Sequence, residues 1–239
     1  MDNFSNVLTQ LKKINEESII DCFVPSTNKQ VKFKPMTVAQ QQQIIKNLAN
    51  GASDNLKIIN SINDIIIANS IDCSDLKIID REVVLLQYRL HDATINEQDQ
   101  TKIKDAIKGI KKESKNIALT HAVAGYGITI NCAIPSLQRD SAINAAAVAF
   151  FESNNVTRMQ DMAAALYAYQ IIKFINSITV ADNTVSFESI EDLPSLMQII
   201  DNLPVDLNNA VLTYANGVQN TFTKALKDKN IALQTPTMQ

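Results

Sequence analysis

The sequence predicts a helix-dominated α+β protein with small β-hairpins near the N-terminus and around residues 176–188. Glycine and proline are scarce, at 5 and 6 among 239 residues, so few positions interrupt regular structure. Most apolar residues recur at helical spacing, whereas short stretches around two turns alternate between apolar and polar residues. Hydrophobic residues make up 46% of the chain, which is enough to build a buried core.

The first elements expected are a short helix over residues 1–15 and a β-hairpin. Apolar and polar residues alternate on both sides of a Pro-Ser-Thr-Asn turn at 25–28, which predicts a hairpin with one solvent-facing side. The alternating apolar positions are Ile20, Cys22, Val24, Val31 and Phe33.

Three helices should follow the hairpin. Thr37 and Gln40 have the spacing of a capping box, which predicts a helix to about Leu48. A second helix is expected from near Asp54, because its isoleucines recur at helical spacing. Asp80 is expected to cap a third helix.

Residues 92–116 form a polar segment in which Ile103, Ile107 and Ile110 are spaced by four and three residues. This spacing predicts an amphipathic helix, and the low apolar content suggests a mobile element on the surface. The segment is the best candidate for an insertion or a boundary, which would divide the chain into 1–118 and 119–239. A single domain is the alternative.

The second half begins with a predicted strand, GITINCAI, over residues 127–134, in which apolar positions alternate. The glycines around Tyr126 are expected to bend this strand. An alanine-rich helix should run from about Ser136 to Phe151, and another should start near Thr157.

A second hairpin is expected around the tight turn at 181–184, separate from the first hairpin rather than part of one continuous sheet. Ser189 and Asp192 have the spacing of a helix cap, and the helix that follows contains Leu193 and Leu196.

The last element predicted is a long amphipathic helix that ends near Lys227. Its apolar residues step by four, three, four and four: Leu207, Val211, Tyr214, Val218 and Phe222. Such a stripe packs either against a partner protein or into the core of the same chain. Tyr214, Val218 and Phe222 are therefore the candidate partner interface, and core packing is the alternative.

The charge balance argues against a nucleic-acid-binding protein, because the net charge is −3 and such proteins need a clustered positive excess. Six lysines do cluster between Lys102 and Lys115, but Asp105 and Glu113 interrupt them, which is typical of a solvated helix face. No apolar stretch approaches the ~20 residues that a membrane span requires, and the N-terminus does not resemble a secretory signal. We therefore expect synthesis in the cytoplasm and no membrane span.

The sequence offers little catalytic or metal-binding chemistry. The only histidines, His91 and His121, lie far apart, and no nucleophile elbow or glycine-rich phosphate loop accompanies them. Three distant cysteines at positions 22, 73 and 132 form no disulfide or zinc pattern. We expect no catalytic residue, no cofactor and no metal site. An active site assembled in space around His91 or His121 is the alternative.

Two segments, over about residues 31–90 and 165–225, have landmarks in a recognisable order. The first contains Phe33-Lys34-Pro35, then Asp80-Arg81-Glu82, and it ends with Tyr88-Arg89-Leu90. The second is YQIIKFINSITVADNTVSFESIEDLPSLMQIIDNLP, an isoleucine-rich stretch, an acidic turn and an acidic helix start. In this order the two segments resemble the baseplate hub proteins of T-even-type contractile-tailed bacteriophages.

The resemblance implies a non-enzymatic structural subunit of the virion tail baseplate hub, made in the host cytoplasm. Its partners would be other hub or tail proteins, including the tape-measure protein. A transient assembly chaperone absent from the mature virion and a cellular helical adaptor are the alternatives. Some proteins of the family carry paired cysteines near the C-terminus, but residues 203–239 contain neither Cys nor His, so no metal site is carried over.

Overall fold

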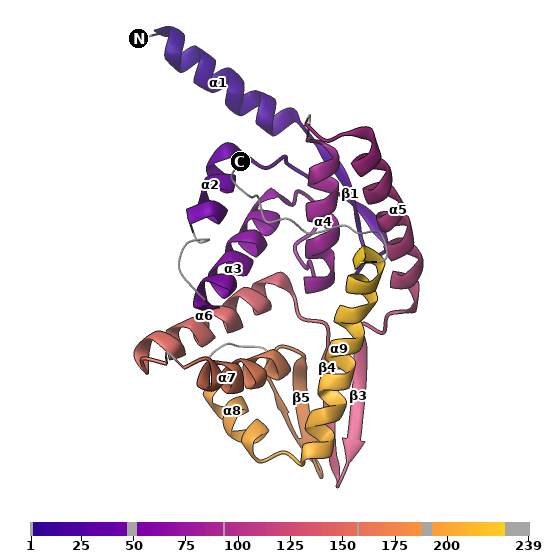
Figure 1. Ribbon diagram of the computed structural model, residues 1–239. Helices are drawn as coiled ribbons and strands as arrows, with labels where there is room; N and C mark the ends of the chain where they lie inside the picture. Colours follow the sequence, from indigo (N-terminus) through magenta and orange to yellow (C-terminus); the bar gives the residue numbers. More distant parts are fainter. Residues whose placement is uncertain (1, 47–51, 93, 157, 188–192, 228–239) are drawn as a thin grey trace.

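The computed structural model describes residues 2–46, 52–92, 94–156, 158–187 and 193–227. Its first half contains α1 (Asp2–Glu17), β1 (Ile20–Val24), β2 (Lys29–Phe33), α2 (Val38–Lys46), α3 (Ala52–Asn69), α4 (Ile78–Leu90), α5 (Glu97–Glu113) and η1 (Ser114–Asn116). Its second half contains β3 (Thr120–Gly125), β4 (Ile128–Ala133), α6 (Leu137–Ser153), α7 (Met159–Ile172), β5 (Ile175–Val180), β6 (Asn183–Ser186), α8 (Leu193–Asp201) and α9 (Val205–Lys227). The helix-dominated α+β class is confirmed (Figure 1).

The N-terminal hairpin forms as predicted, with β1 and β2 antiparallel and Cys22 opposite Val31. The hairpin is fastened to α4 by two side chains. Gln87 accepts a hydrogen bond from the Phe23 N–H at 2.6 Å and donates one to the Phe23 carbonyl at 3.0 Å. The buried Asp80 carboxylate accepts hydrogen bonds from the N–H and the hydroxyl of Ser26 in the hairpin turn.

Two predicted helix starts have different outcomes. The capping box of α2 is confirmed, because the Thr37 N–H donates to Gln40 and the Gln40 N–H donates back to the Thr37 hydroxyl. The prediction that Asp80 is the cap of α4 is wrong by one turn, because the helix begins at Ile78 and Lys77 is the capping residue. Asp80 instead accepts a hydrogen bond from the Lys77 N–H from inside the first turn.

The second sheet is larger than predicted. Strands β3, β4, β5 and β6 form one four-stranded antiparallel sheet in that order, so the second hairpin is not isolated. Strand β3 was not predicted, because its sequence THAVAG alternates only weakly. The expected strand bend is a two-residue turn in which Tyr126 and Gly127 both have positive φ, 55° and 72°. Such a turn matches the twist of a hairpin and favours glycine.

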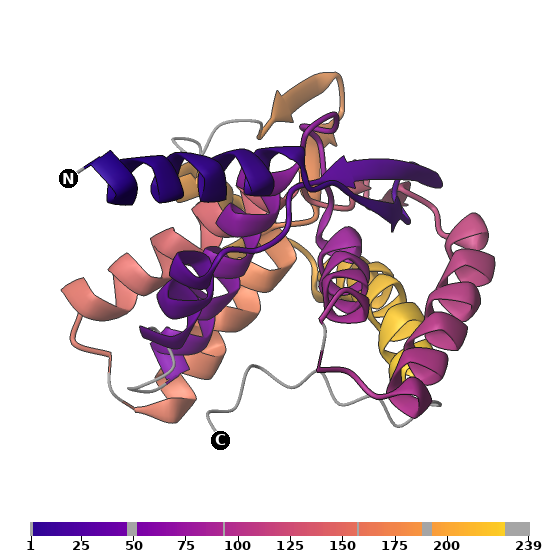
Figure 2. The ribbon, with the colours of Figure 1, turned by 90° about the horizontal axis from the view of Figure 1, so that it is seen from above.

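Helix α5 is amphipathic as expected, but it does not lie loosely on the surface. Ile103, Ala106 and Ile110 are buried, and the helix packs against α4 and α9 (Figure 2). The main buried cluster extends from Ile20 to Val218 and takes side chains from both halves of the chain.

The remaining helices of the second half agree with their predictions. Ser136 caps α6 by accepting a hydrogen bond from the Arg139 N–H at 3.1 Å, and α7 and α9 lie where helices were expected. The expected cap formed by Ser189 and Asp192 lies outside the described residues.

Candidate protein-docking surface

The apolar stripe of α9, predicted from its spacing, faces the interior of this chain. Leu207, Val211 and Val218 are all at most 5% exposed, and the helix packs against α4, α5, α7 and β3. Val218 therefore packs into the core of its own chain, which was the alternative to a partner interface. Phe222 lies on the last turns of α9, but its side chain is outside the described residues.

Tyr214 is half-buried and fixes α9 against the segment that leads into β3. Its hydroxyl donates hydrogen bonds to the carbonyls of Ala118 at 2.9 Å and Leu119 at 3.1 Å. Its ring stacks on His121 with 5.2 Å between centroids and meets Phe174 edge-on at 6.0 Å. Burial raises the pKa of Tyr214 to about 12. Tyr214 therefore belongs to intramolecular packing.

A second apolar stripe lies on α1, and there the side chains are exposed. It consists of Phe4, Val7, Leu8, Leu11 and Ile14, which we call the α1 stripe. Their exposed fractions run from 44% for Leu8 to 76% for Phe4, and every residue from Phe4 to Glu17 is exposed. In Figure 1 the indigo α1 projects from the rest of the protein at the point where β1 begins.

The apolar residues of the α1 stripe have the same helical spacing as those of a helix that packs into a core. Its residues recur at spacings of three, one, three and three, so they share one side of the helix. A helix of 16 residues is only marginally stable by itself in water. Contiguous exposed apolar residues of this kind mark sites of association, so the α1 stripe is the candidate docking surface. The spacing was visible in the sequence, but it could not reveal that the stripe would be exposed.

The charges of α1 do not favour a lipid surface as its contact. Its sequence contains Lys12 and Lys13 against Asp2, Glu16 and Glu17. Helices that lie in a membrane interface are rich in basic residues on the polar face. The α1 helix lacks that excess, so its apolar side is better suited to a protein.

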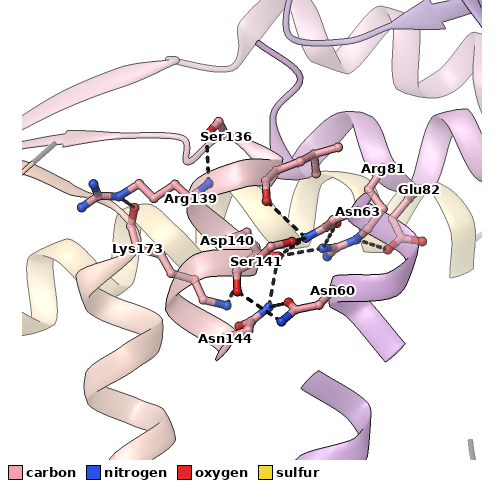
Figure 3. A network of polar contacts seen from close by, with 11 residues as sticks. Asn60, Asn63, Arg81, Glu82, Ser136, Arg139, Asp140, Ser141, Asn144 and Lys173 are labelled. Carbon is pink, nitrogen blue, oxygen red and sulfur yellow. Dashed lines mark hydrogen bonds and ion pairs between the residues drawn. The ribbon is translucent and has the colours of Figure 1, made fainter. Parts of the chain in front are cut away.

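A buried polar network connects the two halves of the chain (Figure 3). At its centre is Asp140 of α6, whose carboxylate is 2.7 Å from the Lys173 ammonium and 3.0 Å from the Arg81 guanidinium. Asn63 of α3 donates to Asp140 at 2.9 Å and accepts from Arg81 at 3.1 Å. Asn144 adds a donor from one turn further along α6.

In this network the charges of Lys173 and Arg81 stabilise the ionised carboxylate of Asp140. Burial raises the pKa of Asp140, but Lys173 and Arg81 outweigh it and hold that pKa below its ordinary value. Burial lowers the pKa of Lys173, and the pairing with Asp140 opposes the change. The side chains of Asp140 and Lys173 are 4% and 6% exposed, so the cluster orients α6 against α3 and α4 out of contact with solvent.

Arg139, next to Asp140, points to the other side of α6 and binds backbone. Its guanidinium donates to the carbonyls of Lys173, Ile175 and Phe187, and therefore joins α6 to the end of α7 and the edge of the sheet. Neither this role nor that of Asp140 was predicted, because both depend on residues more than 30 positions away.

The residues weighed for catalysis lie apart from this network. His91 is exposed at the C-terminal end of α4, and His121 stacks on Tyr214. Burial raises the pKa of Cys22 to about 12 and that of Cys132 to about 11, which disfavours reactive thiolates. Among the described residues, no three His, Cys, Asp or Glu side chains gather as a metal site would require. Within the same ranges, no helix has the length and apolar character to span a membrane.

Comparisons with known proteins give no relative: no family model matches the chain, and neither does any curated protein or solved structure.

Proposed function

We propose that this chain is a non-enzymatic structural subunit of a contractile-tail baseplate hub and acts through protein–protein contacts. The observation that carries the proposal is the α1 stripe, a continuous row of five exposed apolar residues on a projecting helix. Burial of such a row stabilises an interface at roughly 25 cal/mol for each Å² of apolar surface removed from water. From Phe4 to Glu17, the part of α1 whose side chains are described, no side chain is buried in the core of its own chain.

The tail assignment comes from the resemblance of residues 31–90 and 165–225 to baseplate hub proteins. Within it, the partners are other hub or tail proteins, including the tape-measure protein, and the location is the baseplate of the virion.

The first test is quantitative mass spectrometry of purified virions beside isolated tail-assembly intermediates. A fixed copy number in both supports a permanent subunit. Presence only in intermediates would make the protein a transient assembly chaperone. Absence from both would overturn the tail assignment and favour a cellular helical adaptor.

A pair of matched variants tests the role of α1 in the same particles. Leu11→Glu places a charge in the middle of the α1 stripe, and Val185→Glu places one at a similarly exposed apolar position on β6. We expect Leu11→Glu to remove the protein from the assembly and Val185→Glu to leave its copy number unchanged. Equal incorporation of both variants would contradict a docking role for α1.

A further inference from the structure

We infer that two copies of this chain pair through their α1 stripes, with the two helices antiparallel. This inference rests on the proposed role of α1 as a contact surface, and it names the partner: a second copy of the chain.

The spacing of the stripe suits a helix pair. Phe4, Val7, Leu11 and Ile14 are separated by three, four and three residues, the pattern of a two-helix seam. These positions are also symmetric about residue 9. When two such helices lie antiparallel, Phe4 of each copy faces Ile14 of the other and Val7 faces Leu11, so all four layers are apolar. Leu8 borders the seam near its centre.

The charges distinguish the antiparallel from the parallel arrangement. The last turn of α1 contains Glu16 and Glu17 and no basic residue. Acidic residues there oppose the dipole of their own helix, whose C-terminal end is negative. In an antiparallel pair they lie beside the N-terminal end of the other copy, where the positive helix dipole and Asp2 are both present, so three acidic residues meet at each end of the pair. In a parallel pair, four glutamates would gather at one end and repel one another.

The place of α1 on the protein permits this pairing. The helix projects from the body, and only Ser18 and Ile19 separate its end from β1 (Figure 1). With a rise of 1.5 Å per residue, 16 residues span roughly 24 Å. Antiparallel pairing therefore places the two bodies at opposite ends of a rod, where they do not compete for space.

The size of the interface sets the expected affinity. If all five exposed apolar side chains of each helix are covered, the pair buries roughly 1,000 Å² in total, which lies in the range of weak and transient protein contacts. We therefore expect a reversible dimer with a Kd on the order of 10 μM, rather than a permanent one.

Sedimentation equilibrium of the full chain, from about 1 to 300 μM, tests the pairing. We expect a monomer–dimer equilibrium that Val185→Glu leaves unchanged and that Leu11→Glu weakens at least ~30-fold. A chain that stays monomeric over this range, or dimers indifferent to Leu11→Glu, would overturn the inference. Loss of Leu11→Glu from tail particles together with a monomeric wild type would leave the proposed function standing and point to another protein as the occupant.

Nitroxide labels test the orientation. One label replaces Thr9, near the symmetry point, and another replaces Glu16, each in a Cys73→Ser background because Cys22 and Cys132 are buried. Antiparallel helices hold the two Glu16 labels roughly 20 Å further apart along the axis than the two Thr9 labels. Equal distances at both positions would show parallel pairing and overturn the inference. Binding of the wild type, but not of Leu11→Glu, to neutral phosphatidylcholine vesicles would also count against a second copy as the natural occupant.

Discussion

Helices α1 and α9 have the same amphipathic design and opposite surroundings. In α9, Leu207, Val211 and Val218 recur at helical spacing and are buried. In α1, Phe4 and Leu11 belong to a stripe of the same kind and are exposed. Periodicity therefore reports that a helix has an apolar side, and it does not report which molecule covers that side.

The difference arises from what surrounds each helix. Helix α9 lies between α5 of the first half and β3 of the second, so both halves of the chain contribute to covering it. Helix α1 is followed at once by the hairpin, and Gln87 and Asp80 fasten that hairpin to α4. The attachment directs α1 away from the core.

The largest effect that this comparison predicts comes from placing a charge in each stripe. Val211→Asp should destabilise the fold by at least ~4 kcal/mol, because Val211 is fully buried and the carboxylate would have no partner. Leu11→Asp should change the free energy of unfolding by less than ~0.5 kcal/mol in dilute solution. Urea unfolding followed by circular dichroism measures both. Similar losses would show that α1 packs on its own chain.

The loss of an ion pair should likewise cost more stability in the interior than on α1. Asp140→Asn removes the carboxylate that pairs with the buried Lys173 and leaves Arg81 paired with Glu82 alone, which should cost about 3–5 kcal/mol. Glu17→Gln breaks the exposed pair with Lys13 on α1 and should cost less than ~0.5 kcal/mol. The same urea experiment compares them, and a small loss for Asp140→Asn would contradict a structural role for the network.

The pH dependence of the free energy of unfolding should reveal the titration of Asp80. This carboxylate binds the turn of the hairpin that follows α1. Burial raises the pKa of Asp80 to about 6, although hydrogen bonds from Ser26 and Lys77 oppose the shift. A carboxyl with a raised folded-state pKa contributes stability that is fully present below its unfolded pKa of about 4 and is lost as the pH rises through 6.

The difference in free energy of unfolding between wild type and Asp80→Asn should therefore fall by about 2 kcal/mol from pH 4 to pH 7. Asp75→Asn makes the same substitution at an exposed carboxylate and is the matched control. Denaturant titrations at four pH values measure both variants. A difference for Asp80→Asn that rises with pH would contradict the assignment.

The smallest expected effect concerns two tyrosines. Tyr214→Phe removes the hydroxyl that binds the Ala118 and Leu119 carbonyls, and it should cost about 1 kcal/mol. Tyr126→Phe removes an exposed hydrogen bond to Asp206 and should lower the stability less than Tyr214→Phe does. Thermal unfolding resolves the two. Equal melting temperatures would weaken the case that Tyr214 belongs to the core.

The features predictable from the sequence are those that nearby residues determine. The capping box of Thr37 and Gln40 needs only its own turn of helix, and the first hairpin needs only two alternating segments. The sequence of β3 alternates too weakly to predict a strand, and β3 forms a strand because it pairs with β4.

The candidate site was less predictable than the fold because it depends on tertiary surroundings. Asp140 and Lys173 are 33 residues apart, and nothing in either segment indicates that they pair. The α1 stripe was visible as periodicity, but its exposure follows from where the hairpin docks. The baseplate role remains a proposal drawn from the resemblance and from α1.

The way the first hairpin is bonded also bears on aggregation. Along the outer edge of β2, the Lys32 N–H binds Asp72, the Lys32 carbonyl binds the Ile71 N–H, and the Lys34 N–H binds the Asn69 carbonyl. On the β1 edge, the Gln87 amide occupies both backbone groups of Phe23. At these positions the backbone groups are already hydrogen-bonded, so a neighbouring chain cannot add a strand to the hairpin. Fibrillar stacking through this hairpin first requires the β1 edge to detach from α4 or the β2 edge to detach from residues 69–72.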